Sequence, residues 1–116
     1  MEKLKEIFKV IREDFHAVVP PLVAKIDQEH HYEVWAVAKG KETFFGKVVM
    51  HKDYIELAFY PDLSRETKWE LYPGFMFDLL EETSDCVFKD LSPEMRKGIA
   101  ESIGNLINEF KLRGLL

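Results

Sequence analysis

The sequence predicts an α+β fold in which helices pack on one face of an antiparallel sheet. Three observations predict it: helical periodicity at both ends of the chain, β-branched and aromatic runs between them, and turn residues that separate those runs. A chain of 116 residues has the length of one domain with one hydrophobic core. We therefore expect residues 1–116 to form a single α+β domain.

The first expected element is an amphipathic helix over residues 2–18. Its apolar residues recur in steps of three and four, and charged residues fill most of the other positions. The apolar set is Leu4, Ile7, Phe8, Ile11, Phe15 and Val18. Pro20 and Pro21 end the helix, because proline lacks the backbone N–H that the helical ladder needs.

Two strands are expected next, over residues 22–26 and 32–38. Both are rich in β-branched or aromatic residues, and the polar residues 27–31 connect them. Gly40 lies in the following turn, where glycine can take a positive φ. These segments predict an antiparallel meander that leads into a central hairpin.

The central hairpin spans residues 43–61 around a two-residue loop, Lys52-Asp53. Side chains alternate between the two faces of a strand, so this loop sets every cross-strand pair. The core-facing pairs are all apolar: Met50 with Ile55, Val48 with Leu57, and Gly46 with Phe59. The other face pairs His51 with Tyr54, Val49 with Glu56, Lys47 with Ala58, and Phe45 with Tyr60. A slip of one residue would expose the apolar set, which specifies the register.

The next part of the chain is less regular. Residues 65–72 receive no assignment, because Trp69 and Leu71 fit both the helical and the strand period. Residues 75–82 predict a short helix after a Pro-Gly break, and residues 85–89 predict a short added strand.

A long helix is expected over residues 92–113, with Ser92 as N-cap and Pro93 at the first helical position. Its apolar positions repeat every four residues: Met95, Ile99, Ile103, Ile107 and Phe110. A glycine inside a helix costs about 1 kcal/mol relative to alanine. Gly98 and Gly104 therefore predict close packing against the helix backbone.

Composition limits the classes of function. A formal net charge of -5 argues against binding to a nucleic-acid backbone, which needs clustered Lys and Arg. The single Cys86 cannot form an intrachain disulfide, and residues 1–6 lack the apolar core of a signal peptide, so we expect a cytoplasmic protein. No apolar run approaches the roughly 20 residues that cross a bilayer.

Several segments together resemble the central part of the YdhG-like family of small bacterial domains: residues 32–38, Gly40-Lys41, Phe44-Phe45-Gly46, His51-Lys52 and Ala58-Phe59-Tyr60-Pro61. Residues 86–91 and the terminal helix resemble the late strand and helix of that family. The family's tyrosine-then-proline feature before the hairpin is missing, because Glu33 follows Tyr32. The resemblance implies a helix-backed sheet in a family whose members mostly have no assigned function. One branch is described as a frataxin-like intracellular iron chaperone.

The strongest candidate site is an aromatic sheet face made of Trp35, Phe45, Tyr54 and Tyr60. These side chains combine large apolar area with polar tips, and monomers seldom leave such a patch bare. Three covers are possible: residues 65–82 of the same chain, a second subunit, or a ligand. Cover by the same chain is the commonest solution in a layered domain.

A second candidate is the acidic group Glu81, Glu82 and Asp85, which could attract a hard cation such as iron. Adjacent residues of a helix diverge, so Glu81 and Glu82 also fit a solvated acidic face. Residues 30–31, His30-His31, fit a surface loop, and His16 fits the end of a helix dipole. Cys86 has no local partner to lower its pKa and fits a small buried hydrophobic residue.

The leading hypothesis is a non-enzymatic binding domain without a cofactor, which binds a small molecule or a protein partner on the aromatic sheet face. One alternative is an iron chaperone that uses Glu81, Glu82 and Asp85. Another is a self-associating module, such as a homodimer. No nucleophile, base or phosphate loop in the sequence predicts an enzyme.

Overall fold

The computed structural model describes residues 2–116 and has one five-stranded antiparallel sheet in the order β1-β2-β3-β4-β5. The strands are β1 (Val23–Gln28), β2 (His31–Ala38), β3 (Lys41–Met50), β4 (Ile55–Phe59) and β5 (Asp85–Phe88). The helices are α1 (Glu2–His16), α2 (Arg65–Leu71), α3 (Phe75–Leu80) and α4 (Pro93–Leu112). The predicted α+β fold with a meander sheet is confirmed.

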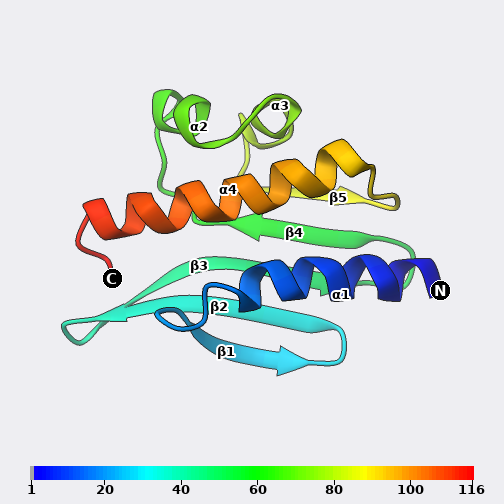
Figure 1. Cartoon of the computed structure of the whole chain (residues 1–116), viewed down its shortest axis with the longest axis horizontal. Helices are drawn as coiled ribbons and strands as arrows, with labels where there is room; N and C mark the ends of the chain where they lie inside the picture. The colour runs from blue at the N-terminus through cyan, green and yellow to red at the C-terminus, as the bar shows by residue number, and fades with distance from the viewer. Residues whose placement is uncertain (1) are drawn as a thin grey trace.

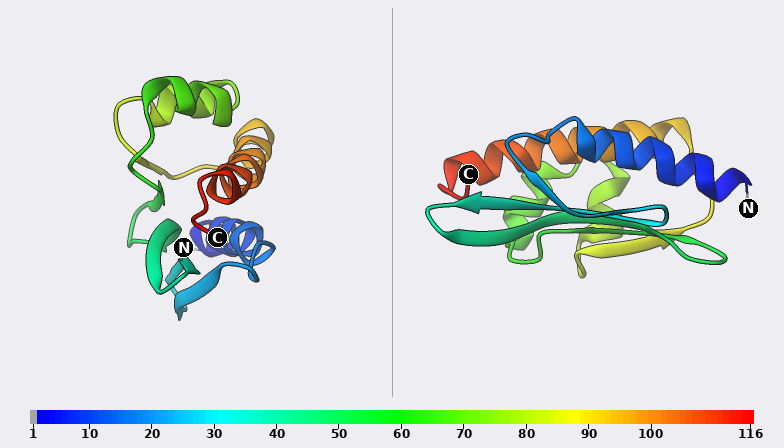
Figure 2. Two further views of the ribbon diagram at one scale, coloured as in Figure 1. Left: turned by 90° about the vertical axis from the view of Figure 1, so that its left-hand side faces the viewer. Right: turned by 90° about the horizontal axis from the view of Figure 1, so that it is seen from below.

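Helices α1 and α4 lie side by side on one face of the sheet (Figures 1 and 2). Their apolar stripes bury Phe15 and Phe110 completely against the strands. Ser92 caps α4 as predicted, because its Oγ accepts a hydrogen bond of 3.1 Å from the Met95 amide. None of the helices within residues 2–116 has the length and apolar character needed to cross a membrane.

The register of the central hairpin is confirmed. Met50 pairs with Ile55, Val48 with Leu57, and Gly46 with Phe59, as the apolar alternation predicts. Gly46 leaves the space that the Phe15 ring fills, since a Cβ on Gly46 would lie 2.7 Å from Phe15 Cε1. The hairpin is therefore the part of the sheet on which α1 packs most closely.

A β-bulge in β3 moves Phe45 from the expected outer face into the core. Val34 pairs with Gly46 and Trp35 pairs with Phe44, so Phe45 is an extra residue in this ladder. Its ring is fully buried and lies 5.0 Å from the Phe110 ring, centroid to centroid. The prediction that Phe45 belongs to the aromatic sheet face is wrong, and Phe44 takes that place.

Tyr60 is also directed toward the helices. Its amide donates to the Phe45 carbonyl at 2.9 Å, so the predicted pairing of these residues exists in the backbone. Its ring packs edge-on against Phe110 at 5.1 Å between centroids. The prediction that Tyr60 belongs to the aromatic sheet face is wrong, because the chain leaves β4 at Phe59 and turns toward α4.

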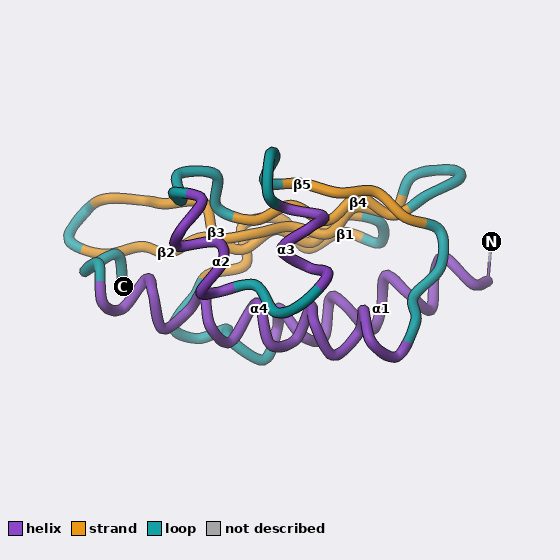
Figure 3. Tube along the Cα trace, turned by 90° about the horizontal axis from the view of Figure 1, so that it is seen from above, coloured by secondary structure: helices purple, strands orange, loops and turns teal. Residues whose placement is uncertain are grey.

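The unassigned residues 65–72 form α2, which Ser64 caps by accepting a hydrogen bond from the Thr67 amide. Helices α2 and α3 lie beyond the β5 edge of the sheet, next to α4 (Figures 1 and 3). The expected intrachain cover is thus limited to one corner of the sheet, where the connections before α2 and after α3 reach the far face (Figure 3).

The two glycines of α4 differ. A Cβ on Gly98 would lie 2.7 Å from Met76 Cγ, so the predicted close packing is confirmed there. A Cβ on Gly104 would meet nothing within 4 Å, and the same prediction is wrong for that position. Gly104 lies on the exposed side of α4.

Candidate binding site on the open sheet face

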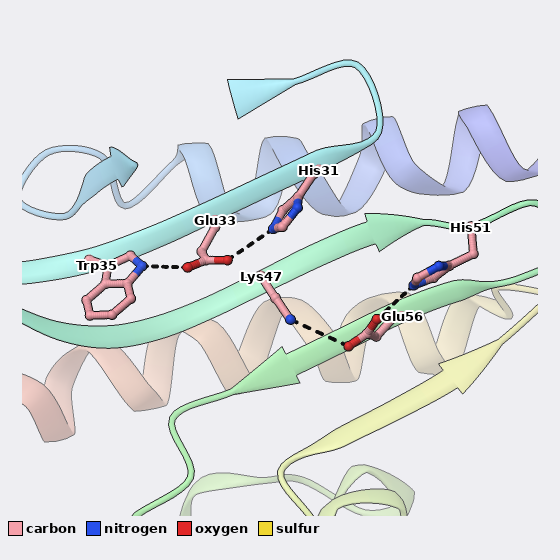
Figure 4. Close-up of polar contacts among 6 residues, drawn as sticks. All are labelled: His31, Glu33, Trp35, Lys47, His51 and Glu56. Atoms are coloured by element: carbon pink, nitrogen blue, oxygen red, sulfur yellow. Dashed lines mark hydrogen bonds and ion pairs between the residues drawn. The ribbon is translucent and has the colours of Figure 1, made fainter. Parts of the chain in front are cut away.

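We call the sheet surface opposite α1 and α4 the open face, because no helix of residues 2–116 covers it (Figure 2). Period-two alternation brings its side chains from adjacent strands into one layer. The polar and aromatic members are His31, Glu33, Trp35, Phe44, Lys47, His51, Tyr54 and Glu56. Several of them form two separate polar groups (Figure 4).

The first polar group lies along β2. Trp35 Nε1 donates to Glu33 Oε2 at 2.7 Å, and His31 Nε2 lies 3.0 Å from Glu33 Oε1. Residues two apart in a strand point to the same side, which is why these three side chains meet. The Lys25 ammonium lies 4.6 Å from the centre of the Trp35 ring and adds a cation–π contact. The Glu33 carboxylate therefore contacts both His31 and Trp35, which lie on the same side of the strand.

The second polar group centres on Glu56 of β4. His51 Nε2 lies 2.7 Å from Glu56 Oε1, and Lys47 Nζ lies 3.6 Å from Glu56 Oε2. The hydrogen bond with His51, helped by the Lys47 charge, lowers the pKa of the Glu56 carboxyl below its usual value despite partial burial. Glu56 is therefore ionised at neutral pH and keeps both partners in place.

The predicted aromatic residues do not form one patch. Phe45 and Tyr60 face the helices, as described above. Tyr54 stacks on His51 at 4.5 Å between ring centroids, beside the Lys52-Asp53 loop. Trp35 lies at the other end of the face, where β2 pairs with Phe44. The open face thus carries aromatic rings at two ends and charged groups between them.

A groove of about 700 Å³ opens at the corner where the open face meets the connections of α2 and α3. Strands β3 and β4 contribute Lys47, Glu56 and Ala58. Arg65 comes from the start of α2, Glu82 from the connection after α3, and Asp85 from the start of β5. Phe44, which precedes the bulge residue Phe45, adds an apolar surface to the groove.

The charges in the groove are only partly neutralised within the chain. Arg65 Nε donates to Glu81 Oε2 at 2.6 Å, so that pair is satisfied. Glu82 and Asp85 form no ion pair with any side chain of residues 2–116. The groove therefore offers two free carboxylates.

The candidate metal residues Glu81, Glu82 and Asp85 all line this groove. Within residues 2–116, however, no three His, Cys, Asp or Glu side chains converge as a metal site requires. Arg65 occupies the Glu81 carboxylate. Iron binding by these residues remains a prediction from the sequence.

Three further sequence predictions have clear outcomes. Cys86 is half-buried against the core, and burial raises the pKa of its thiol to about 11, which fits the small hydrophobic residue expected there. His31 is the first residue of β2 and binds Glu33, so its assignment to a surface loop is wrong. His16 lies in the last turn of α1 as predicted, with Nδ1 2.9 Å from the Tyr32 hydroxyl.

Comparison of the chain with protein-family models, with curated proteins and with solved structures returns no match. The resemblance to the YdhG-like family therefore remains a prediction. Function has to be argued from the geometry and charge of the groove and the open face.

Proposed function

We propose that this protein is a binding domain that binds a small ligand in the groove between its open face and the α2–α3 connections. One observation carries the proposal: the groove has a volume of about 700 Å³, within the range of about 300–1,000 Å³ that is usual for ligand sites.

The free carboxylates of Glu82 and Asp85 favour a ligand with at least one cationic group. The carboxylates of Glu56 and Glu81 already have partners in the chain. Phe44, which also lines the groove, can contact an apolar part of the same ligand. The best match is therefore a small organic cation, such as an amine that also carries an aliphatic or aromatic portion.

The floor of the groove is preorganised. Lys47 and Glu56 belong to the centre of the sheet, and their contacts with each other and with His51 restrict their rotamers. Side chains that are already ordered lose less conformational entropy when a ligand binds. This supports binding without rearrangement of the strands.

The proposal is tested by NMR titration of ¹⁵N-labelled protein with a panel of diamines, polyamines and basic amino acids, and with dicarboxylates as the opposite charge. We expect at least one cation to give saturable shifts at the amides of Lys47, Ala58 and Asp85, and dicarboxylates to give none. Ala58→Tyr should abolish these shifts by filling the groove. Val87→Tyr is the matched control, because Val87 is 63% exposed on the neighbouring strand and does not line the groove.

A panel in which no cation gives saturable shifts in the groove would overturn the proposal. The same conclusion would follow if Ala58→Tyr and Val87→Tyr had equal effects.

The iron-chaperone alternative uses the same corner of the molecule, since Glu82 and Asp85 line the groove and form no ion pair within residues 2–116. Calorimetric titration with ferrous iron separates it from the leading proposal. Saturable heat that Glu82→Gln and Asp85→Asn abolish would support iron binding. Absence of heat under anaerobic conditions would eliminate it.

The self-association alternative places a second copy over the open face. Sedimentation of the wild type across a range of concentrations tests it, because a species at the monomer mass of 13.6 kDa throughout would leave it without support. Trp35→Ala is the informative variant. Phe45→Ala would instead disrupt the core, since Phe45 is completely buried.

A further inference from the structure

Trp69 of α2 is an exposed aromatic residue that neither the fold nor the proposed groove explains. Its side chain is 70% exposed, and it is absent from the lining of the groove. Its ring meets Phe77 of α3 edge-on, with centroids 5.0 Å apart and planes at 90°. Phe77 is buried and therefore fixes one side of the indole, while most of the remaining surface of the ring faces solvent.

A hollow of about 440 Å³ lies beside this ring. Its lining consists of Arg65, Glu66, Trp69, Glu70 and Phe77. It lies at the α2–α3 edge of the molecule, which projects beyond β5 and away from α1 (Figure 1). A partner can therefore reach it without displacing any other helix.

The lining of this hollow has one cation, Arg65, and two carboxylates, Glu66 and Glu70. Arg65 is already paired with Glu81. Glu66 and Glu70 form no ion pair with any side chain of residues 2–116. They are one helical turn apart, an arrangement in which like charges destabilise a helix.

We infer that this surface docks a basic segment of a partner protein. One Lys or Arg side chain of the segment lies over the Trp69 indole, and the adjacent basic side chains of the segment pair with Glu66 and Glu70. A cation over an aromatic face is attracted by the ring quadrupole, and Trp is the strongest ring for this contact. The aliphatic stem of the same side chain covers the apolar surface of the indole. Exposed Trp residues with one buried side are also typical anchors of protein interfaces.

A peptide segment fits this surface better than an isolated small cation. Glu66 and Glu70 are one helical turn apart and line the same hollow as Trp69, so the two carboxylates can pair with successive basic side chains of an extended segment. A free amine would satisfy one of them and leave the ring largely exposed. Of the lining residues, the hollow and the groove have only Arg65 in common, and the inference does not depend on the proposed function.

The test uses fluorescence anisotropy with a labelled peptide, Gly-Arg-Lys-Ala-Arg-Lys-Ala-Gly, and with its counterpart that has Glu at every basic position. We expect saturable binding of the basic peptide only, together with a shift of the Trp69 indole N–H signal in NMR spectra. Trp69→Ala and the double variant Glu66→Lys/Glu70→Lys should each weaken binding by about tenfold or more, as expected for interface anchors. Because these side chains are exposed, circular dichroism should show folded variants.

Two matched controls accompany the test. Glu101→Lys reverses one charge on the exposed side of α4, half the change of charge in the double variant, and should change the affinity by less than about twofold. Ala58→Tyr fills the groove and should leave peptide binding unchanged, which separates this inference from the proposed function.

Three results would overturn the inference. The first is equal binding of the acidic peptide, and the second is unchanged binding of the basic peptide to Trp69→Ala. The third is concentration-dependent dimerisation of the wild type that Trp69→Ala abolishes, because a second copy would then be the occupant. The basic side chains Lys5, Lys9 and Arg12 border a hollow next to α1 and would be the contact surface in that case.

Discussion

Glu56 is the residue that joins the two strands of the central hairpin on the open face. It lies on β4 and binds His51 after β3 and Lys47 within β3, so one carboxylate joins both strands of the hairpin. Its pKa is lowered, chiefly by the hydrogen bond with His51. A carboxyl group whose pKa is lower in the folded state stabilises the fold at pH values above its unfolded pKa. That stabilisation is lost as the pH falls through the folded pKa.

We therefore expect Glu56→Gln to lower the free energy of unfolding near pH 6 by about 0.5–1 kcal/mol, the upper part of the range for partly exposed pairs. The difference from wild type should shrink as the pH falls below the unfolded carboxyl pKa of about 4.3. Urea unfolding at several pH values measures both effects. Glu101→Gln, on the exposed side of α4, is the control. A difference that stays constant with pH would contradict the assignment of the shift to Glu56.

Phe44 and Phe45 are adjacent residues with opposite environments. Phe45 is completely buried between Phe15 and Phe110, whereas Phe44 is only partly buried on the open face against Trp35. We expect Phe45→Ala to destabilise the protein by about 3–5 kcal/mol and Phe44→Ala by about 1 kcal/mol. Chemical denaturation of the two variants measures the contrast. Equal losses would show that the bulge does not orient these rings as described.

At the scale of elements, α2 and α3 form one unit. Lys68 of α2 joins them, because its ammonium binds carbonyls at the end of α3 and just after it. Lys68 Nζ donates to the carbonyls of Leu80 at 2.8 Å, and of Glu81 and Thr83 at 3.3 Å. These carbonyls include orphan acceptors at the C-terminal end of a helix, where a cation also interacts favourably with the dipole. The buried ammonium is thus satisfied by the backbone.

Replacement of Lys68 by Met should leave these buried acceptors without their partner. We expect a loss of about 1–3 kcal/mol in the free energy of unfolding, the usual cost of unsatisfied buried polar groups. The matched control is Lys97→Met on the exposed surface of α4, which should stay within about 0.5 kcal/mol of wild type. A Lys68→Met variant as stable as the control would show that Lys68 is not needed to close α3.

At the scale of the whole molecule, the core lies between the sheet and the α1–α4 layer, and α2–α3 lies outside that sandwich (Figure 1). Met76 and Leu80 attach α3 to the core, and Asn105 Nδ2 donates to the Leu71 carbonyl at 2.8 Å to attach α2 to α4. We therefore expect the α2–α3 unit to be less stable than the sandwich of the sheet with α1 and α4. The proposed ligand groove lies where the rigid sheet meets the less tightly attached unit.

Local opening should follow this division. Segments with fewer buried apolar contacts open at lower free energies than the core. We expect amides of α2 and α3 to exchange with deuterium at least about tenfold faster than the central amides of β2 and β3. Native-state hydrogen exchange followed by NMR measures the rates, with β3 amides as the internal reference. Uniform protection across α2, α3 and β3 would contradict the division.

The strands and the two long helices could be predicted from the sequence because their signals are local. The pairing of Val48 with Leu57 follows from alternation around the Lys52-Asp53 loop, and Ser92 starts α4 through contacts within its own first turn. The short helix α2 was not predictable, because its seven residues contain too few apolar positions to define a period.

The candidate site was predictable only in part. Lys47, Glu56 and Tyr54 were correctly expected on the outer face, since they follow the hairpin register. Phe45 and Tyr60 were assigned to the wrong face. The alternation of apolar and polar residues reveals neither the bulge at Phe45 nor the turn after β4. Trp69 also fits both periods, so its exposure depends on how α2 packs on α3.

The amino-acid sequence by itself determined which segments become strands or long helices and which residues of the hairpin face each other. Only the tertiary structure decided which rings are buried, where the groove lies and which carboxylates remain without partners. The physical reason is that the apolar repeat of a helix or strand depends on residues that are close together in the sequence. The groove, by contrast, depends on Lys47, Arg65 and Asp85, which folding brings together from separate elements.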